Sequence, residues 1–203
     1  NQSGLAFFSR FPIQEAVRRS LPIEESVMKL VDLDRCYSVQ RIPVENGKEL
    51  VVYHLHLSAY TSDGTIAEEQ LKMLFDDMQT EYEKGNYILG AGDFNKDLLG
   101  NSAERFGFED AQAYTWAQPI PDSLIPSFLS ILGPYDEANP VPSCRNADKP
   151  YSAESFVVTV DGFIVSDNIE VKESQVIDTQ FAYSDHNPVL LDFALLDSAK
   201  SEA

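Results

Sequence analysis

Residues 65–95 read TIAEEQLKMLFDDMQTEYEKGNYILGAGDFN, a segment that predicts one helix followed directly by one short strand. A helix over about residues 66–84 is indicated because apolar side chains recur there every three or four positions, the period of one helical face. Gly85 is a suitable C-terminal stop for it. Residues 86–91 form a short apolar run typical of a buried strand. The apolar face of the helix comprises Ala67, Leu71, Leu74, Phe75, Met78 and Tyr82.

On the N-terminal side, residues 36–44 and 50–57 are apolar, alternating segments that flank Glu45-Asn46-Gly47-Lys48. Asn-Gly between two such segments predicts a β-hairpin. The order strand 50–57, helix 66–84, strand 86–91 implies a crossover unit, and therefore an α/β domain. Further upstream, residues 4–8 predict a buried strand that enters a loop at Pro12, since proline cannot continue a ladder of hydrogen bonds.

On the C-terminal side, a long irregular region precedes the remaining strands. Seven of the eleven prolines lie between Pro119 and Pro150, and the aromatic content of residues 112–155 predicts a packed loop rather than a disordered one. No linker divides the chain, so residues 1–203 are predicted to form one domain. The strands predicted after the loop are residues 156–160, 163–166, 169–177 and 189–196.

Composition restricts the class of partner. With 33 acidic and 15 basic residues, the net charge of −18 disfavours tight binding to a duplex nucleic acid. A small phosphorylated substrate is compatible with this charge, because a bound divalent cation reverses the local sign. No apolar run approaches the roughly 18 residues of a membrane span, so the sequence predicts a soluble chain in either the cytoplasm or the extracellular space. Cys36 and Cys144 are predicted to be buried free thiols, with one disulfide as the alternative.

Polar residues able to do chemistry stand where predicted strands end, which is where ligand sites gather in open α/β sheets. Asp161 interrupts an apolar run, and a carboxylate there is costly to bury unless it is paired. His186 is the natural partner, which the carboxylate would orient and make more basic, next to Asp185 as a metal ligand. The full set is His56, Asp93, Asn95, Asp161, Asp185 and His186.

Each of these features also has a structural interpretation. The motif around Asp93 could be an Asx turn, the one around Asp185 a turn before a strand, His56 a core histidine, and Asp161 a member of a structural ion pair. Taken together in one chain, they are far more specific to a catalytic site than any of them is alone.

Three ordered motifs resemble the endonuclease/exonuclease/phosphatase family. They are Gly92-Asp93-Phe94-Asn95, the segment VDGFIVS at residues 160–166, and the segment SDHNPV at residues 184–189. His56-Leu57-Ser58 resembles a fourth motif, and LAFFSRFPI at residues 5–13 resembles the strand and loop before them. The resemblance implies a four-layered α/β sandwich with two central mixed β-sheets, and a metal-dependent hydrolysis of phosphoesters.

The resemblance also implies roles for the residues that match. Asp185 would ligate Mg²⁺, or Mn²⁺ as the alternative ion, with Asp93 also at the metal and positioning the nucleophile. His186, oriented by Asp161, would activate the attacking water or stabilise the transferring phosphoryl group. These roles suit phosphoryl transfer, in which positioning and charge stabilisation do most of the work.

The remaining roles concern the substrate. Asn95 would donate to a phosphate oxygen and His56 would assist the leaving group. Trp116 and Arg145, in the Pro-rich loop, are candidates for substrate binding, since a guanidinium matches phosphate oxygens in a bidentate way. A surface ion pair is the alternative for Arg145. The substrate is expected to be a phosphorylated small molecule, a lipid head group or a nucleotide-type compound.

The sequence departs from the family pattern at its N-terminal end. The family pattern begins with an Asn-containing strand and a Gln-Glu strand, whose Glu is a principal metal ligand, and neither precedes residues 5–13 here. Gln14-Glu15 falls on the wrong side of the motif and is better explained as a solvated pair. We therefore expect the chain to represent the C-terminal two-thirds of the domain, with weakened Mg²⁺ affinity. The alternatives to a hydrolase are an inactive binding module of the same fold and a nuclease.

Overall fold

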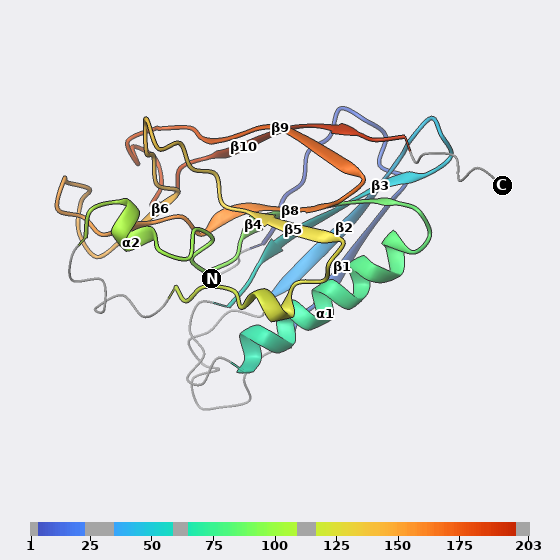
Figure 1. Ribbon diagram of the computed structural model, residues 1–203, viewed down its shortest axis with the longest axis horizontal. Coiled ribbons are helices and arrows are strands. Elements are labelled where there is room, and N and C mark those ends of the chain that lie inside the picture. The colour runs from blue at the N-terminus through green and yellow to red at the C-terminus, as the bar shows by residue number, and fades with distance from the viewer. Residues whose placement is uncertain (1–3, 23–34, 59–64, 109–116, 198–203) are drawn as a thin grey trace.

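The computed structural model describes residues 4–22, 35–58, 65–108 and 117–197. Its largest element is a mixed sheet of six strands in the order β1-β2-β3-β4-β8-β5 (Figure 1). The one parallel pair in this sheet is β3 with β4, and the connection between them contains helix α1, Thr65–Tyr82. The strands are β1 (Glu15–Ser20), β2 (Cys36–Pro43), β3 (Glu49–His56), β4 (Tyr87–Asp93), β8 (Asp161–Ser166) and β5 (Leu129–Leu132).

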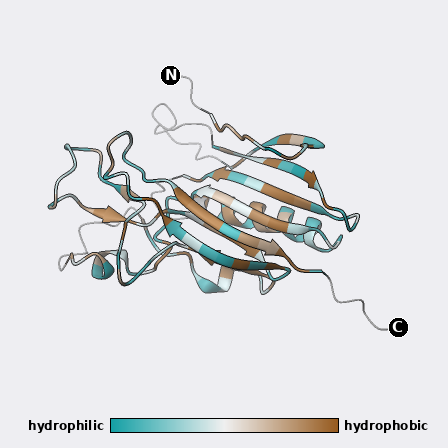
Figure 2. Ribbon diagram, turned by 90° about the horizontal axis from the view of Figure 1, so that it is seen from above, coloured by the Kyte–Doolittle hydropathy of each residue, from teal (hydrophilic) through white to brown (hydrophobic). Residues whose placement is uncertain are grey.

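The central sheet is covered on both faces. Helix α1 packs on one face, where its buried residues Leu71, Leu74 and Met78 join the main core. A two-stranded antiparallel sheet of β9 (Ile169–Val176) and β10 (Val189–Leu195) covers the other face, as Figure 1 shows. Apolar positions run along the central strands between these layers (Figure 2). The predicted α/β class is therefore confirmed, while a four-layered sandwich with two central mixed β-sheets stays a prediction.

The elements with the clearest periodicity fold as predicted. The hairpin β2–β3 turns at Asn46 and Gly47, with the Val44 and Lys48 backbones hydrogen-bonded at 2.8 Å. Helix α1 ends at Tyr82, and the Gly85 N–H donates to the Tyr82 carbonyl at 2.8 Å. Strands β4, β9 and β10 also lie within two residues of the predicted bounds.

The predicted strand at residues 4–8 is wrong. These residues have no regular structure, and Phe8 is 92% exposed. The edge strand is instead β1, every residue of which is exposed. Its backbone pairs with β2 along its whole length, so hydrogen bonding rather than an apolar pattern holds it in place. Glu15 is exposed, as predicted for a solvated residue, and forms an ion pair with Arg41 at 3.3 Å.

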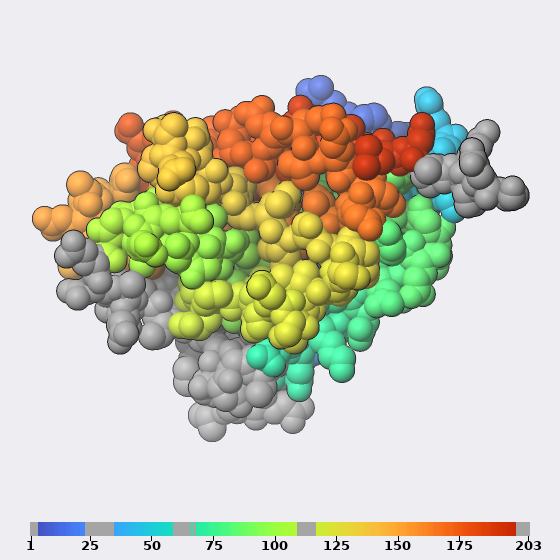
Figure 3. Space-filling view, viewed as in Figure 1, coloured from blue at the N-terminus to red at the C-terminus, as the bar shows by residue number. Residues whose placement is uncertain are grey.

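The Pro-rich region contains more regular structure than the sequence indicated. It contributes β5 to the central sheet, the short helix η3 (Asp122–Leu124) and strand β6 (Cys144–Arg145), which pairs with β7 (Val157–Val158). A one-turn helix, α2 (Ser102–Arg105), precedes it. Phe128 stacks on Tyr82 of α1 with ring centroids 4.3 Å apart. The part of this region after residue 117 lies across one face of the molecule, coloured yellow in Figure 3.

Two further expectations concern the thiols and membranes. Cys36 and Cys144 are both free, so the disulfide alternative is wrong; Cys144 is buried as predicted, whereas Cys36 is only half-buried. Within the described ranges, no helix combines the length and the apolar character needed to cross a membrane.

Candidate active site

Strand register places three polar residues side by side at one edge of the central sheet. His56 is the last residue of β3 and pairs with Asp93, the last residue of β4, because parallel strands end at the same edge. Asp93 pairs in turn with Asp161, the first residue of the antiparallel strand β8. Paired residues on neighbouring strands share a face, so the three side chains form one row.

Two glycines allow the strands to approach closely beside this row. Gly92 has φ +147°, and a Cβ built there would lie 2.0 Å from the Leu55 carbonyl oxygen. Gly162, which pairs with Gly92 across β4 and β8, would bring a Cβ to 2.3 Å from the Leu132 carbonyl oxygen. Any other residue would push the strands apart, so these glycines help to fix the separation of the carboxylates that follow and precede them.

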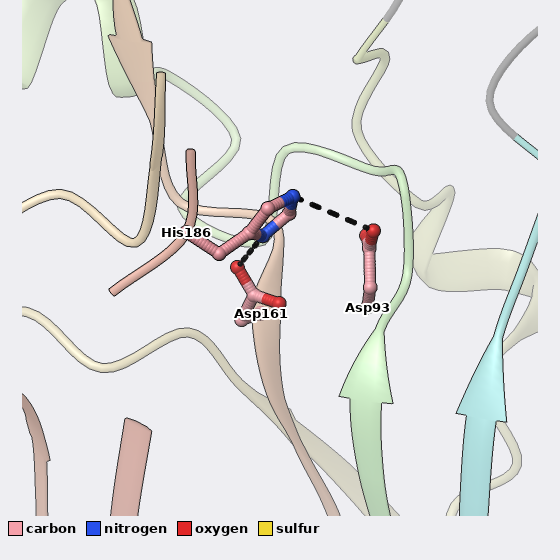
Figure 4. Close-up of side chains that lie close together, drawn as sticks. All are labelled: Asp93, Asp161 and His186. Carbon is pink, nitrogen blue, oxygen red and sulfur yellow. Dashed lines mark hydrogen bonds and ion pairs between the residues drawn. The ribbon is translucent and has the colours of Figure 1, made fainter. Parts of the chain in front are cut away.

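His186 joins the row from the loop that precedes β10. Its Nδ1 lies 2.8 Å from Asp161 Oδ2, and its Nε2 lies 3.9 Å from Asp93 Oδ2 (Figure 4). Donor atoms of Asp93, Asp161 and His186 all lie within 4.8 Å of one another, so these residues could hold a metal ion. The contact with Asp161 fixes the tautomer of the neutral imidazole, with the proton on Nδ1 and the lone pair on Nε2.

Sequence reasoning missed Ser143, which positions Asp161. The Ser143 hydroxyl donates to Asp161 Oδ2 at 2.8 Å and accepts from the backbone N–H groups of Val160 and Asp161 at 3.0 Å. The side chain is fully buried. Nothing in the local sequence indicated this role, because a serine in a Pro-rich loop is ordinarily a turn residue and its partners lie 17 and 18 positions away.

Asn187 anchors the loop that carries His186. Its side-chain amide donates to the Pro142 carbonyl at 3.0 Å, and its Oδ1 accepts from the Thr179 hydroxyl at 2.7 Å. Its backbone N–H donates to the Ser143 carbonyl at 2.7 Å. The loop before β10 is therefore tied directly to the segment that positions Asp161.

Cys144 lies against the other nitrogen of His186. Its Sγ is 3.6 Å from His186 Nε2, and the thiol donates to the Arg145 carbonyl at 3.5 Å. The residue is only 5% exposed. Burial raises the pKa of this thiol, although the contact with His186 opposes the rise.

The ionisable side chains of Asp93, Asp161 and His186 lie close together and are largely shielded from water. Burial and the neighbouring charge of Asp161 together raise the pKa of Asp93 to about 6, against the opposing effect of His186. Burial lowers the pKa of His186, but the hydrogen bond that its Nδ1–H donates to Asp161, the contact with Cys144 and the charges of both partners together outweigh this effect, and the net pKa is raised. The row thus contains two carboxylates that repel each other beside one imidazole that favours the protonated form.

His56 and Asn95 flank Asp93. His56 Nε2 lies 2.7 Å from a guanidinium nitrogen of Arg35 and 3.3 Å from Asp93 Oδ2. Nε2 of His56 therefore lies between a guanidinium group and a carboxylate. Asn95, at φ +49°, donates its backbone N–H to Asp93 Oδ1 and its side-chain amide to the Leu57 carbonyl, both at 2.8 Å.

The other predicted site residues lie differently. Asp185 does not belong to the group of donor atoms that Asp93, Asp161 and His186 form. Its backbone carbonyl accepts from the Arg145 N–H at 3.0 Å. The Arg145 guanidinium donates to the carbonyls of Asn146 and Lys149, at 2.7 and 3.0 Å. Trp116 lies outside the described residues.

The donor set suits a divalent cation. Carboxylate oxygens and one imidazole nitrogen are common ligands of such ions. The repulsion between Asp93 and Asp161, which raises the pKa of Asp93, is the kind of interaction that a bound cation would relieve. The described residues thus form an α/β fold with a carboxylate–histidine group at one edge of its central sheet, a site able to bind a metal ion.

Solved structures with this fold include several phosphatases. The mannosyl-6-phosphatase of Bacteroides thetaiotaomicron is 19% identical, with 91% of this chain and 67% of that one aligned at a TM-score of 0.59. An endonuclease/exonuclease/phosphatase protein of Beutenbergia cavernae is 19% identical, with 93% and 46% aligned and a TM-score of 0.61. ANGEL2, a 2′,3′-cyclic phosphatase, is 19% identical in complex with adenosine-2′,3′-vanadate, with 91% and 68% aligned and a TM-score of 0.60.

The chain therefore has the endonuclease/exonuclease/phosphatase fold, as its motifs predicted. It spans between 46% and 68% of the length of these three proteins. Neither a protein-family model nor a curated protein sequence matches it.

Proposed function

We propose that the chain is a divalent-metal-dependent hydrolase of the endonuclease/exonuclease/phosphatase family that cleaves a phosphoester by attack of water. The observation that carries the proposal is the His186–Asp161 pair at 2.8 Å, with the free nitrogen of the imidazole directed toward Asp93. A histidine oriented by a carboxylate, beside a second carboxylate with a raised pKa, is an arrangement suited to proton transfer and charge stabilisation.

His186 would act mainly on the transferring phosphoryl group. Because its pKa is raised, the imidazole is protonated near neutral pH and can donate an Nε2–H to a phosphate oxygen. Asp161 holds the ring in place and stabilises its positive charge, and the Ser143 hydroxyl holds Asp161. Of the two roles expected for His186, this one suits the electrostatics of the row better than acceptance of a proton from water.

Asp93 is the better candidate to orient the attacking water. Its pKa of about 6 in the metal-free protein leaves it ionised at neutral pH, so the carboxylate can accept a hydrogen bond from the attacking water and orient it. Asn95 fixes one oxygen of this carboxylate through its backbone N–H, so the other is directed into the row. We assign the leaving-group side to His56, with Arg35 against it.

Magnesium is the proposed ion, held by Asp93 and Asp161. Asp185, which directly precedes His186 in the sequence, is proposed as a further oxygen donor. Magnesium prefers a few carboxylates and several waters, and a sparse oxygen site fits that preference. When bound, the ion would neutralise negative charge on the phosphate. Mn²⁺ shares this oxygen chemistry and is the alternative.

The substrate class follows from charge and from the neighbours. One neighbour is a mannosyl-6-phosphatase and another is a 2′,3′-cyclic phosphatase. The net charge of −18 disfavours a long polyanion more than a small phosphoester. We therefore propose a phosphorylated small molecule, of sugar or nucleotide type, rather than duplex DNA.

The test is hydrolysis of p-nitrophenyl phosphate, bis-p-nitrophenyl phosphate, sphingomyelin and DNA, with Mg²⁺ or Mn²⁺. We expect turnover of a small phosphoester that His186→Ala and Asp161→Asn reduce by about 10²- to 10⁴-fold. Asp148→Asn is the matched control, because Asp148 is exposed and does not belong to the row. Full activity in His186→Ala would refute the mechanism, and an absence of turnover with every substrate would indicate a binding module.

A further inference from the structure

We propose that Cys144 and His186 form a binding site for a thiophilic cation such as Zn²⁺ or Co²⁺, and that this cation inhibits phosphoester hydrolysis. The inhibitory part rests on the proposed function, since it requires His186 to act on the substrate. The binding part rests on the geometry of three side chains at the edge of the sheet: Cys144, His186 and Asp93.

The first support is the separation of sulfur and nitrogen. Cys144 Sγ lies 3.6 Å from His186 Nε2. A zinc–sulfur distance of about 2.3 Å and a zinc–nitrogen distance of about 2.0–2.1 Å, at a tetrahedral angle, place the two ligand atoms about 3.6 Å apart. The two side chains are therefore already spaced as a shared tetrahedral ion requires.

The second support is the orientation of the imidazole. Metal-binding histidines commonly donate their other ring N–H to a carboxylate, which fixes the tautomer and strengthens the ligand. His186 Nδ1 lies 2.8 Å from Asp161 Oδ2, and Asp161 is itself held by the Ser143 hydroxyl at 2.8 Å. The nitrogen that faces Cys144 is thus the one that carries a lone pair in the neutral ring.

The third support is the rigid placement of the sulfur. Cys144 belongs to β6 and pairs with Val158 of β7, and it also forms a backbone bridge with His186. The backbones on both sides of the sulfur–nitrogen contact are therefore fixed to each other. A site built on paired backbone holds its ligands more reliably than one built on independent loops.

Asp93 supplies an oxygen donor to the same ion. Its Oδ2 lies 3.9 Å from His186 Nε2, compared with about 3.3 Å for two such ligands of a tetrahedral zinc. Cys144 does not belong to the group of donor atoms within 4.8 Å that Asp93, Asp161 and His186 form, so Asp93 must move toward an ion held by Cys144 and His186, and water completes the coordination. On binding, the Cys144 S–H bond and the His186 Nε2–H bond break, both protons pass to solvent, and the thiolate and the neutral imidazole nitrogen form the bonds to the metal.

A nucleophilic role for Cys144 fits the structure less well. A Cys-His-Asp series can serve covalent catalysis, but the nucleophile must reach a substrate. Cys144 is 5% exposed, and its Sγ contacts both the Arg145 carbonyl and His186 Nε2.

The thiol also makes the proposed site selective for thiophilic ions over Mg²⁺. Thiolate and imidazole ligands favour Zn²⁺ and Co²⁺, whereas Mg²⁺ prefers oxygen. Mg²⁺ would therefore use the carboxylates of the row and leave His186 available to the substrate. A thiophilic ion would occupy His186 Nε2 and remove it from the phosphoryl group, so trace Zn²⁺ should inhibit turnover in Mg²⁺.

The test is a Co²⁺ titration of the metal-free protein followed by absorption spectroscopy. We expect a near-ultraviolet thiolate-to-Co²⁺ charge-transfer band that saturates at one equivalent and disappears when Zn²⁺ displaces Co²⁺. Cys144→Ser and Cys144→Ala should lose the band. Cys36→Ser is the matched control and should keep it, because these are the only two cysteines. Circular dichroism establishes that each variant is folded.

The outcomes separate this inference from the proposed function. A wild-type protein without the band, a band that survives in both Cys144 variants, or a band lost in folded Cys36→Ser would overturn the cation site. Hydrolysis with Mg²⁺ is measured in a separate assay. Turnover without a charge-transfer band leaves the proposed function intact, whereas a band without turnover supports the cation site and counts against the hydrolase.

Discussion

Replacing Asp93 by asparagine should stabilise the protein at neutral pH while it damages the proposed site. A carboxyl group whose pKa is higher in the folded than in the unfolded state contributes stability that is fully present below its unfolded pKa. That contribution is lost as the pH rises through the folded pKa. The pKa of Asp93 is raised to about 6 by burial and by the charge of Asp161. The free energy of unfolding of the wild-type protein should therefore decrease between about pH 4 and pH 7. Asp93→Asn should not show this part of the decrease.

The magnitude follows from the size of the pKa change. The pKa rises from an ordinary value of 3.8 to about 6, and one pKa unit corresponds to about 1.4 kcal/mol, so ionised Asp93 costs about 3 kcal/mol. The side chain is only 15% exposed, so solvent screens this cost little. The asparagine keeps an oxygen to accept from the Asn95 N–H, and the substitution should not disturb the local turn.

The assay is urea denaturation of both proteins in EDTA at intervals from pH 4 to pH 8. The stability of Asp93→Asn relative to wild type should increase by about 3 kcal/mol over this range and level off above pH 7. Asp148→Asn, which replaces an exposed carboxylate outside the row, is the control. A relative stability of Asp93→Asn that stays constant with pH would refute the reasoning, because it would mean that Asp93 titrates normally in the folded protein.

Three further substitutions test two residues that support the row and one ion pair elsewhere in the fold. Ser143→Ala should destabilise the protein by about 1–3 kcal/mol, measured by urea denaturation, because it leaves buried partners without a hydrogen bond. Gly92→Ala should cost more than about 3 kcal/mol or prevent folding, seen by circular dichroism, because its Cβ would meet the Leu55 carbonyl. Glu81→Gln should lower stability by about 3–5 kcal/mol at pH 7, and by little near pH 2, because Arg41 holds the pKa of Glu81 at about 2.

Most of the fold could be predicted because its central elements carry strong local signals. The apolar face of α1 recurs at helical spacing, and the Asn46-Gly47 turn joins two alternating segments. Strands β1 and β5 were missed for opposite reasons. The exposed strand β1 is defined by its pairing with β2, and β5 is a four-residue strand within a Pro-rich region. Pairing partners that are distant in sequence leave no periodic pattern in a short segment.

The residues that form the site could be predicted more readily than the residues that contact and position them. Asp93 and Asp161 were recognisable because acidic residues interrupt or end apolar runs, and strand register brings them together. Ser143 and Cys144 gave no comparable signal, since both lie in an irregular segment and meet the row only through tertiary structure. The assignment of Asp185 to a metal stays a prediction, with its carboxylate outside the group that the other three donors form.

The cost of ionising Asp93 also explains how stability and cation binding are linked at this edge of the sheet. Two carboxylates held on neighbouring strands cannot move apart without breaking the register of β4 and β8, so their repulsion persists in the folded protein. A cation that binds the folded state relieves that repulsion and lowers the pKa of Asp93. Part of its binding free energy therefore comes from strain that folding has already stored. It follows that added divalent cation should stabilise the wild-type protein more than Asp93→Asn, and that this difference should grow as the pH rises through 6.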